Sequence, residues 1–509
     1  MSRSHSANLF DLIAARGPSA DKLALETGDA TALTYGELFA RSAQAAHALV
    51  ALGVRPGDRV AAQVEKSTDV IVVALACFRA GAVLLPLNTA YTLAELEYFL
   101  GDAEPALILC RPDQVEPVRA LALKLGLKRV ESLGVKRDGT FADAIAAALP
   151  VFETVSRASG DLAAILYTSG TTGRSKGAML THENLTSNAL TLVECWRFAS
   201  ADRLIHALPV FHTHGLFVAV NVALLAGATM LYMNRFDPDA VIAAMPQATS
   251  MMGVPTFYTR LLDHPGLDRA ACANMRLFVS GSAPLLAETH RAWRERTGFA
   301  ILERYGMTET NMITSNPYDG ERRPGTVGFA LPGVSVRIAS PEDGAPVRGG
   351  EVGVIEVKGP NVFPGYWRMP EKTAQEFRAD GFFITGDLAR VDEDGYIHIV
   401  GRAKDLVISG GFNVYPKEVE SEIDAIEGVL ESAVFGVAHA DFGEGVTAAI
   451  VPRPGAALTE QAILAALSGR LAKFKAPKRI LIVESLPRNA MGKVQKAALR
   501  EAYKDIYRA

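Results

Sequence analysis

The chain has 509 residues, of which 49% are hydrophobic and 21% charged, and its formal net charge is −4. This length exceeds what one hydrophobic core can organise, so we expect two or more domains, and the charge gives no reason to expect a nucleic-acid partner. Its four cysteines lie far apart without a Cys-x-x-Cys pair, which predicts neither a disulfide framework nor a zinc site and fits a reducing cytoplasm.

The first 160 residues alternate between helical and strand patterns. Residues 1–8 are mostly polar and lack the apolar core of a signal peptide. A helix is expected to begin within 33–38 and to continue through 40–52, followed by a strand over 60–64, a helix over 68–80 and a strand over 82–86. This order predicts an α/β domain with a mostly parallel sheet covered by helices.

A loop of small and hydroxylated residues follows an apolar run, 162–166, that is typical of a buried strand. Residues 167–177 hold five Ser or Thr hydroxyls, three glycines and Lys176. Glycines let a backbone approach an anion closely, and successive N–H groups with a lysine form an anion site. The loop therefore favours phosphate binding over a solvated turn.

The loop is not the common nucleotide-binding loop G-x-x-x-x-G-K-[ST]. Ser175 stands where that pattern needs its second glycine. Residues 177–180 predict a short strand, and Thr181 is expected to cap a helix that runs to about Cys195. Because the loop joins two strands, a kinase or ATPase of the common phosphate-loop type is not expected.

Residues 215–233 form the one stretch that resembles a membrane span, since they carry no formal charge. Gly227 is expected to end a helix within it before a strand over 228–233, so we expect a buried helix–strand unit and no membrane partner. His212 and His214 precede this stretch. They are candidates for a metal pair, but no third ligand is nearby, and a pocket wall is favoured.

Three later stretches place candidate binding groups at strand ends. Residues 277–284 end in the small-residue turn Gly281-Ser282-Ala283, which would let a flat ring lie against the backbone. In the stretch 303–310, Thr308 could donate to a phosphate oxygen and Glu309 could hold Mg²⁺ bound to that phosphate. A helix-start role for Glu309, or a plain strand-to-helix turn at 281–283, is the alternative.

Short strands spaced by turns are expected over 351–400, as in a small antiparallel subdomain. Asp387 follows one of them and could accept from both ribose hydroxyls or cap a turn. Beyond it, the chain is expected to form a small α/β domain with strands over 431–437 and 446–451. Lys493, directly after Gly492, would ordinarily be a solvated charge.

Taken together, these stretches resemble the adenylate-forming superfamily of acyl-CoA synthetases, peptide-synthetase adenylation domains and luciferases. The resemblance covers essentially the whole chain, and its elements occur in the family's order: residues 168–177, 305–309, 385–387, 401–405 and 492–493. It implies an N-terminal adenylation domain, 1–401, of two helix-covered sheet subdomains plus a small β-barrel-like subdomain. A mobile α+β lid domain, 402–509, would follow.

The family's chemistry has two steps. A carboxylate attacks the α-phosphate of ATP and releases pyrophosphate, and coenzyme A then attacks the acyl-adenylate. The resemblance implies that Thr308 contacts the α-phosphate, that Glu309 holds Mg²⁺ and that Lys493 neutralises charge as the carboxylate meets the phosphate. It also implies a hinge at Lys404, and a protein acetyltransferase or deacylase acting on Lys493.

The resemblance assigns the remaining site residues to three groups. His212 joins the catalytic group. The nucleotide-binding group is Thr168, Ser169, Gly170, Thr171, Thr172, Gly173 and Lys176 for the phosphates, Gly281, Ser282 and Ala283 for adenine, Asp387 and Arg402 for ribose, and Glu303, Tyr305 and Gly306. The candidates for a second substrate carboxylate are Arg291, His206 and His212.

Within the superfamily the chain is most similar to malonyl-CoA synthetases, in residues 206–215, 280–291 and 308–312. We therefore expect a ligase that forms malonyl-CoA from malonate, ATP and coenzyme A. The alternatives are another short- or medium-chain acid such as methylmalonate, a peptide-synthetase-type adenylating enzyme, a luciferase-like oxygenase and a non-catalytic AMP-binding protein. A peptide-synthetase module would carry a carrier domain after Lys493, and a non-catalytic relative would have lost Lys493 or Glu309.

Overall fold

The structure is a computed structural model that describes residues 6–28, 32–168, 175–410, 412–468, 470–489 and 492–508. The chain divides into two compact units. Unit 1 consists of Met1–Pro324, Ala330–Ser335 and Lys358–Phe377, and unit 2 consists of Gly325–Phe329, Val336–Val357 and Arg378–Ala509. The expected domain boundary at 401–402 remains a prediction.

Unit 1 contains a sheet with the strand order β6-β5-β3-β4-β7-β8. Its strands pair in parallel except for the antiparallel hairpin of β7 and β8. The bounds are β3 (Arg59–Gln63), β4 (Val83–Pro86), β5 (Leu107–Cys110), β6 (Val130–Ser132), β7 (Leu162–Thr168) and β8 (Lys176–Thr181). The predicted strand–loop–strand arrangement at the candidate phosphate loop is therefore confirmed.

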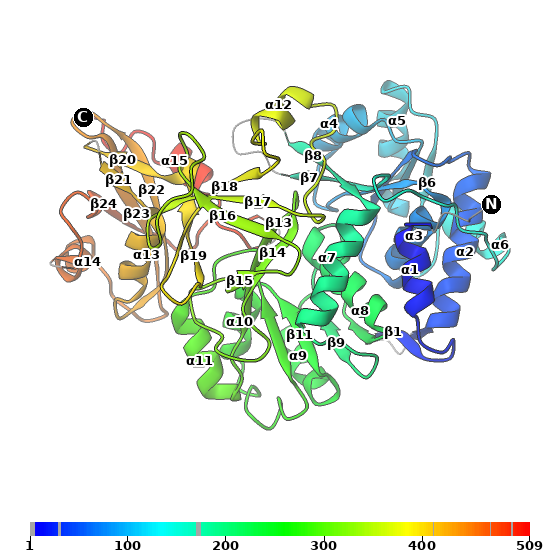
Figure 1. The fold of residues 1–509 in the computed structure, drawn as a ribbon, viewed down its shortest axis with the longest axis horizontal. Helices are drawn as coiled ribbons and strands as arrows, with labels where there is room; N and C mark the ends of the chain where they lie inside the picture. The colour runs from blue at the N-terminus through cyan, green and yellow to red at the C-terminus, as the bar shows by residue number, and fades with distance from the viewer. Residues whose placement is uncertain are drawn as a thin grey trace. The chain divides into compact units, whose positions relative to one another are not determined.

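Helices cover this sheet, and α2 and α3 lie side by side (Figure 1). Every residue of α3 is buried, including Asp69 and Arg79 near its ends, and the stretch 70–78 between them is apolar on all faces. The bounds are α1 (Leu9–Arg16), α2 (Tyr35–Ala51), α3 (Thr68–Ala80), α4 (Leu93–Ala103), α5 (Val115–Lys124), α6 (Thr140–Ala147) and α7 (His182–Cys195). Thr181 caps α7 by accepting from the Asn184 N–H at 3.1 Å, which confirms the predicted start of that helix.

A second sheet of unit 1 has the order β14-β13-β12-β11-β9-β10-β1-β2 and is parallel from β13 to β1. Its strands are β1 (Leu23–Thr27), β2 (Ala32–Thr34), β9 (Arg203–His206), β10 (Thr229–Tyr232), β11 (Ser250–Gly253), β12 (Leu277–Ser280), β13 (Leu302–Met307) and β14 (Asn311–Ser315). The helices after β9 are α8 (Asn221–Ala226), α9 (Pro238–Ala244), α10 (Pro255–Leu262), α11 (Ala287–Thr297) and α12 (Pro370–Gln375).

The uncharged stretch 215–233 forms the predicted helix–strand unit. A π-helical segment, His214–Val220, continues into α8, and Gly227 ends the helix with φ +69° before β10. Within the described ranges, no helix is both long and apolar enough to cross a bilayer.

Unit 2 contains two further sheets. The first has the order β16-β17-β18-β19, and the second has β21-β20-β23-β22 with β24 beside β23. The strands are β16 (Ser335–Ala339), β17 (Gly353–Lys358), β18 (Phe383–Val391), β19 (Ile397–Arg402), β20 (Val407–Ser409), β21 (Phe412–Val414), β22 (Val429–His439), β23 (Gly443–Pro452) and β24 (Arg479–Ile482). The helices are α13 (Pro416–Asp424), α14 (Glu460–Leu467) and α15 (Lys496–Ala502). The two-residue strand β15 (Phe329–Ala330) has its first residue in unit 2 and its second in unit 1.

Candidate active site

The β7–β8 hairpin positions the candidate phosphate loop. Thr168 and Lys176 are paired across the hairpin, and Tyr98 Oη donates to the Ser175 carbonyl at 2.6 Å. These contacts fix the base of the loop. The predicted loop residues Ser169, Gly170, Thr171, Thr172 and Gly173 lie outside the described residues.

Lys176, at the start of β8, contacts residues some 200 positions later in the chain. Its Nζ lies 3.0 Å from Glu376 Oε1 and 4.0 Å from the centroid of the Tyr366 ring. Both charged side chains of this ion pair are about four-fifths buried. The pair therefore lies in surroundings that screen it less than bulk water would.

Tyr366 connects this ion pair to Glu309. The Tyr366 hydroxyl lies 2.6 Å from Glu376 Oε2 and 3.0 Å from Glu309 Oε1, and its single proton can be donated to only one of them at a time. Burial, followed by the Glu309 charge, raises the pKa of Tyr366, so the phenol stays protonated. Glu309 itself is buried.

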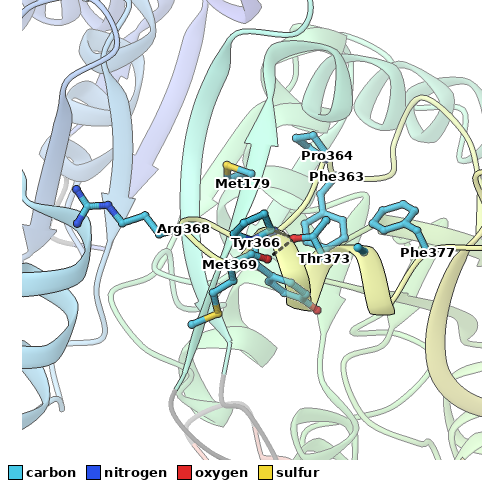
Figure 2. A pocket seen from close by; sticks show the side chains of 10 residues that line it. Met179, Phe363, Pro364, Tyr366, Arg368, Met369, Thr373 and Phe377 are labelled. Carbon is cyan, nitrogen blue, oxygen red and sulfur yellow. Dashed lines mark hydrogen bonds between the residues drawn. The ribbon is translucent and has the colours of Figure 1, made fainter.

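The Tyr366 ring also lines an apolar pocket of about 560 Å³ with Met179, Phe363, Met369 and Phe377. Figure 2 shows these side chains around Tyr366, whose backbone N–H donates to Thr373 Oγ1 at 2.9 Å. Apolar packing on one side and the charged groups on the other hold the Tyr366 ring between them.

The end of β13 brings the predicted phosphate and metal residues together. Tyr305 and Gly306 lie in β13, where the pairing with β14 contains an irregularity, and Thr308 and Glu309 follow directly. A Cβ on Gly306 would lie 2.0 Å from the Asn311 carbonyl oxygen, so the close approach of the two strands requires glycine there.

The predicted adenine turn, 281–283, follows β12. Ser282 adopts φ +72°, and its Oγ lies 3.2 Å from His214 Nδ1. Glu303 is buried and accepts from the Leu285 N–H at 3.3 Å, which ties β13 to the residues after the turn. Ser282 and Glu303 were predicted as members of one nucleotide-binding group, whereas their partners His214 and Leu285 were not part of it.

His206 is a predicted ligand of the second substrate carboxylate, and both of its ring nitrogens are hydrogen-bonded within the protein. Its Nε2 donates to the Gly215 carbonyl at 2.8 Å, and its Nδ1 accepts from Lys66 Nζ at 3.1 Å. Burial and then the Lys66 charge lower the pKa of His206 to about 3, so it is neutral near pH 7. The structure argues against this prediction, because neither ring nitrogen is left for a substrate.

Arg291, the other predicted cation for that carboxylate, is exposed on α11, while its neighbours His290 and Trp293 are buried. The structure therefore does not place its guanidinium among the buried groups of the site, because the buried face of α11 is formed by other residues.

His212 is half-buried beside His214. The described residues contain no group of three or more side chains able to hold a metal ion.

Arg304 is a site residue that the sequence analysis did not single out. It is 3% exposed in β13, and among the described residues its Nε and Nη2 have no hydrogen-bond partner. A Cβ on Gly281 would lie 2.4 Å from Arg304 Cζ, so the turn and the guanidinium approach each other closely. Burial lowers the pKa of Arg304 to about 9, which still leaves it a cation near neutral pH.

Unit 2 carries the predicted ribose pair. Asp387 in β18 and Arg402 in β19 are cross-strand neighbours, and Arg402 Nε lies 2.7 Å from Asp387 Oδ1. Thr385 Oγ1 accepts from the Asp387 N–H at 3.1 Å. The structure thus brings these two predicted residues together.

The other predicted residues of unit 2 are two lysines. Lys404 lies in a short turn after β19, and burial, followed by the Arg402 charge, lowers the pKa of Lys404 to about 8. Lys493 is half-buried after Gly492, and its backbone N–H donates to Asn489 Oδ1 at 2.9 Å. The Lys493 charge contributes to the shift of Lys404.

Comparison with known proteins identifies the class of protein that this fold and these residues define. The AMP-binding enzyme model matches residues 11–367, and the model of the AMP-binding enzyme C-terminal domain matches residues 418–493. The chain belongs to the AMP-binding enzyme family. The predicted family, the predicted α/β fold class and the predicted AMP-forming acid–thiol ligase class are confirmed.

Individual relatives narrow the comparison. A feruloyl-CoA synthase of Amycolatopsis sp is 39% identical over 93% of this chain and 94% of its own length. A malonate–CoA ligase of Arabidopsis thaliana is 35% identical over 88% of this chain and 79% of its own length. The crystal structure of ATP-bound MatB from Rhodopseudomonas palustris is 61% identical, with a TM-score of 0.97 over 99% of this chain and 100% of that chain.

Proposed function

We propose that this protein joins malonate to coenzyme A through a malonyl-adenylate, releasing AMP and pyrophosphate. A malonate carboxylate oxygen attacks the α-phosphorus of ATP as the bond to pyrophosphate breaks. The coenzyme A thiol then attacks the acyl carbonyl, and AMP leaves. The observation that carries the choice of malonate is the buried guanidinium of Arg304, whose Nε and Nη2 have no hydrogen-bond partner among the described residues.

A buried cation without hydrogen-bond partners is costly, and a bound anion would compensate it. Arg304 lies against Gly281 of the proposed adenine turn, so an acyl group joined to the nucleotide would lie close to it. A planar guanidinium matches a carboxylate through two parallel hydrogen bonds. The carboxylate of malonate that does not react supplies that anion, whereas a fatty acid offers only methylene groups.

Neighbouring polar atoms support the same assignment. Among the described residues, Thr213 Oγ1 and His214 Nε2 are also buried without partners. The Arg304 charge is among the causes, after burial, that lower the pKa of His214, so the two groups lie within electrostatic range. With Nδ1 accepting from Ser282, His214 Nε2 would be a further donor to an anion.

We assign the nucleotide roles to the predicted residues. Lys176 would contact the β- and γ-phosphates and Thr308 the α-phosphate. Glu309 fits Mg²⁺, because this ion takes oxygen ligands and commonly combines one or two carboxylates with substrate phosphates. Bound there, the ion would neutralise charge on the phosphates.

The residues of unit 2 complete the proposal. Asp387 would accept from the ribose hydroxyls, and Arg402 orients its carboxylate. Lys493 would meet the reacting carboxylate and the α-phosphate, and acylation by a protein acetyltransferase would remove its charge and stop adenylation. We also propose the cytoplasm as the compartment, which agrees with four free cysteines.

Ferulate is the second candidate substrate, because the feruloyl-CoA synthase is 39% identical to this chain. A hydroxycinnamate has no second carboxylate and would leave Arg304 unpaired. We therefore rank it below malonate.

The direct test of the proposal is malonate-dependent exchange of labelled pyrophosphate into ATP in the absence of coenzyme A. We expect exchange with malonate, and stoichiometric AMP and malonyl-CoA once coenzyme A is added. Absence of both exchange and thioester formation with malonate would contradict the proposed function.

A further inference from the structure

Lys176, the lysine of the candidate phosphate loop, forms an ion pair with the carboxylate of Glu376 in this structure. Glu376 Oε1 lies 3.0 Å from Lys176 Nζ, and the Tyr366 ring covers the same ammonium group. A nucleotide phosphate that binds Lys176 must therefore compete with Glu376. All three residues belong to unit 1.

Glu376 has partners that remain when Lys176 leaves. Lys372 Nζ lies 2.9 Å from Glu376 Oε1, and the Tyr366 hydroxyl lies 2.6 Å from Oε2. Burial alone would raise the pKa of Glu376, but hydrogen bonds from Tyr366, Lys372 and Lys176 lower it, so it is ionised. Loss of one of its three partners would not leave this carboxylate unpaired.

Tyr366 couples this exchange to Glu309. Its single proton is shared between two carboxylates, Glu309 and Glu376. If Glu309 held a metal ion, as proposed, the phenol proton would be free to serve Glu376 alone. That donation stabilises Glu376 at the moment when Lys176 is withdrawn.

We propose that Glu376 is a positioning residue that competes with the nucleotide phosphates for Lys176. It holds Lys176 in place when no nucleotide is bound and takes it back when pyrophosphate leaves. The inference rests on the proposed function only in assigning Lys176 to the phosphates. Its consequence is that Glu376 weakens phosphate binding and favours pyrophosphate release.

The test is calorimetric binding of pyrophosphate and of ATP to Glu376→Gln, which keeps the size of the side chain and removes its charge. Because Lys176 would no longer be held by a carboxylate, we expect both ligands to bind about three- to fivefold more tightly, which corresponds to about 0.7–1 kcal/mol. The matched control is Glu371→Gln, which removes the same charge from an exposed position of α12 and should change neither affinity by more than about twofold.

A double-mutant cycle separates competition for Lys176 from a general field effect. In a Lys176→Met background, Glu376→Gln should no longer strengthen pyrophosphate binding. Unchanged or weaker binding in Glu376→Gln, or equal strengthening with and without Lys176, would overturn the inference. Wild-type protein that binds neither ATP nor pyrophosphate would instead contradict the proposed function.

Discussion

Arg304 makes the proposed substrate testable with a single substitution. Arg304→Met keeps a flexible unbranched stem and removes the N–H donors and the charge. Hydrogen bonds to charged groups contribute about 1.5–3 kcal/mol each, so kcat/KM for malonate should fall about ten- to a hundredfold or more. Propionate, which has no second carboxylate, should be unaffected or improved. The measurement is the ratio of kcat/KM for malonate to that for propionate.

The matched control is Arg291→Met, which changes an exposed arginine of α11 and should leave this ratio unchanged. Thermal unfolding provides a second readout, because replacing an unpaired buried cation with an apolar side chain is often neutral or stabilising. A ratio that changes in Arg291→Met but not in Arg304→Met would return the role to the residue that the sequence first suggested.

Lys493 is expected to serve only the first half-reaction. Lys493→Ala should abolish pyrophosphate exchange, because the negative charges of the carboxylate and the α-phosphate then meet without a neutralising cation. Thioester formation from supplied malonyl-adenylate and coenzyme A should persist. An equal loss in both half-reactions would contradict this division.

At the scale of single elements, His182 links α7 to the start of α1. Its Nδ1 accepts from the Leu9 N–H at 3.1 Å, and burial, followed by the Arg157 charge, lowers the pKa of His182 from 6.5 to about 4. Between these values the unfolded chain binds more protons than the folded one, so stability is complete above pH 6.5 and is lost toward pH 4.

His182→Gln should reduce this loss. We expect the free energy of unfolding of the wild type to fall, through this residue, by on the order of 2–3 kcal/mol between pH 7 and pH 4. Urea unfolding of both proteins across this range measures the difference. Parallel pH profiles would show that His182 does not titrate in the folded state in the manner that its burial implies.

The elements near the site were predictable where local chemistry defines them. Thr181 followed by Asn184 at the third helical position forms the cap of α7, and Gly227 ends α8. The contacts between elements were not predictable. Lys176 and Glu376 are 200 residues apart, and nothing local to either residue indicates the partner.

The site residues show the same limit. Asp387 and Arg402 were predicted together and are cross-strand neighbours. Arg291 was predicted from the resemblance and Arg304 was not singled out, and only the packing of α11 and β13 shows which guanidinium is buried. The prediction for His206 did not take its partner Lys66 into account, because Lys66 is 140 residues away in the sequence.

At the scale of the whole molecule, the proposed two-step reaction would require a movement between half-reactions. We expect a hinge at Lys404, which lies in the short turn after β19. Lys404→Pro would fix φ near about −65° and should leave adenylation largely intact while impairing thioester formation. Pyrophosphate exchange and single-turnover thioester formation separate the two steps. Normal turnover of malonate by this variant would place the hinge elsewhere.

Family membership alone does not decide the acid, because one fold supports many substrates. The measurement that tests the central claim most directly is kcat/KM for coenzyme A-dependent AMP formation with malonate, propionate and ferulate in the wild-type protein. A site with a buried donor for a second carboxylate should favour malonate over both other acids by about a hundredfold or more. A kcat/KM for ferulate or propionate equal to that for malonate would contradict the account.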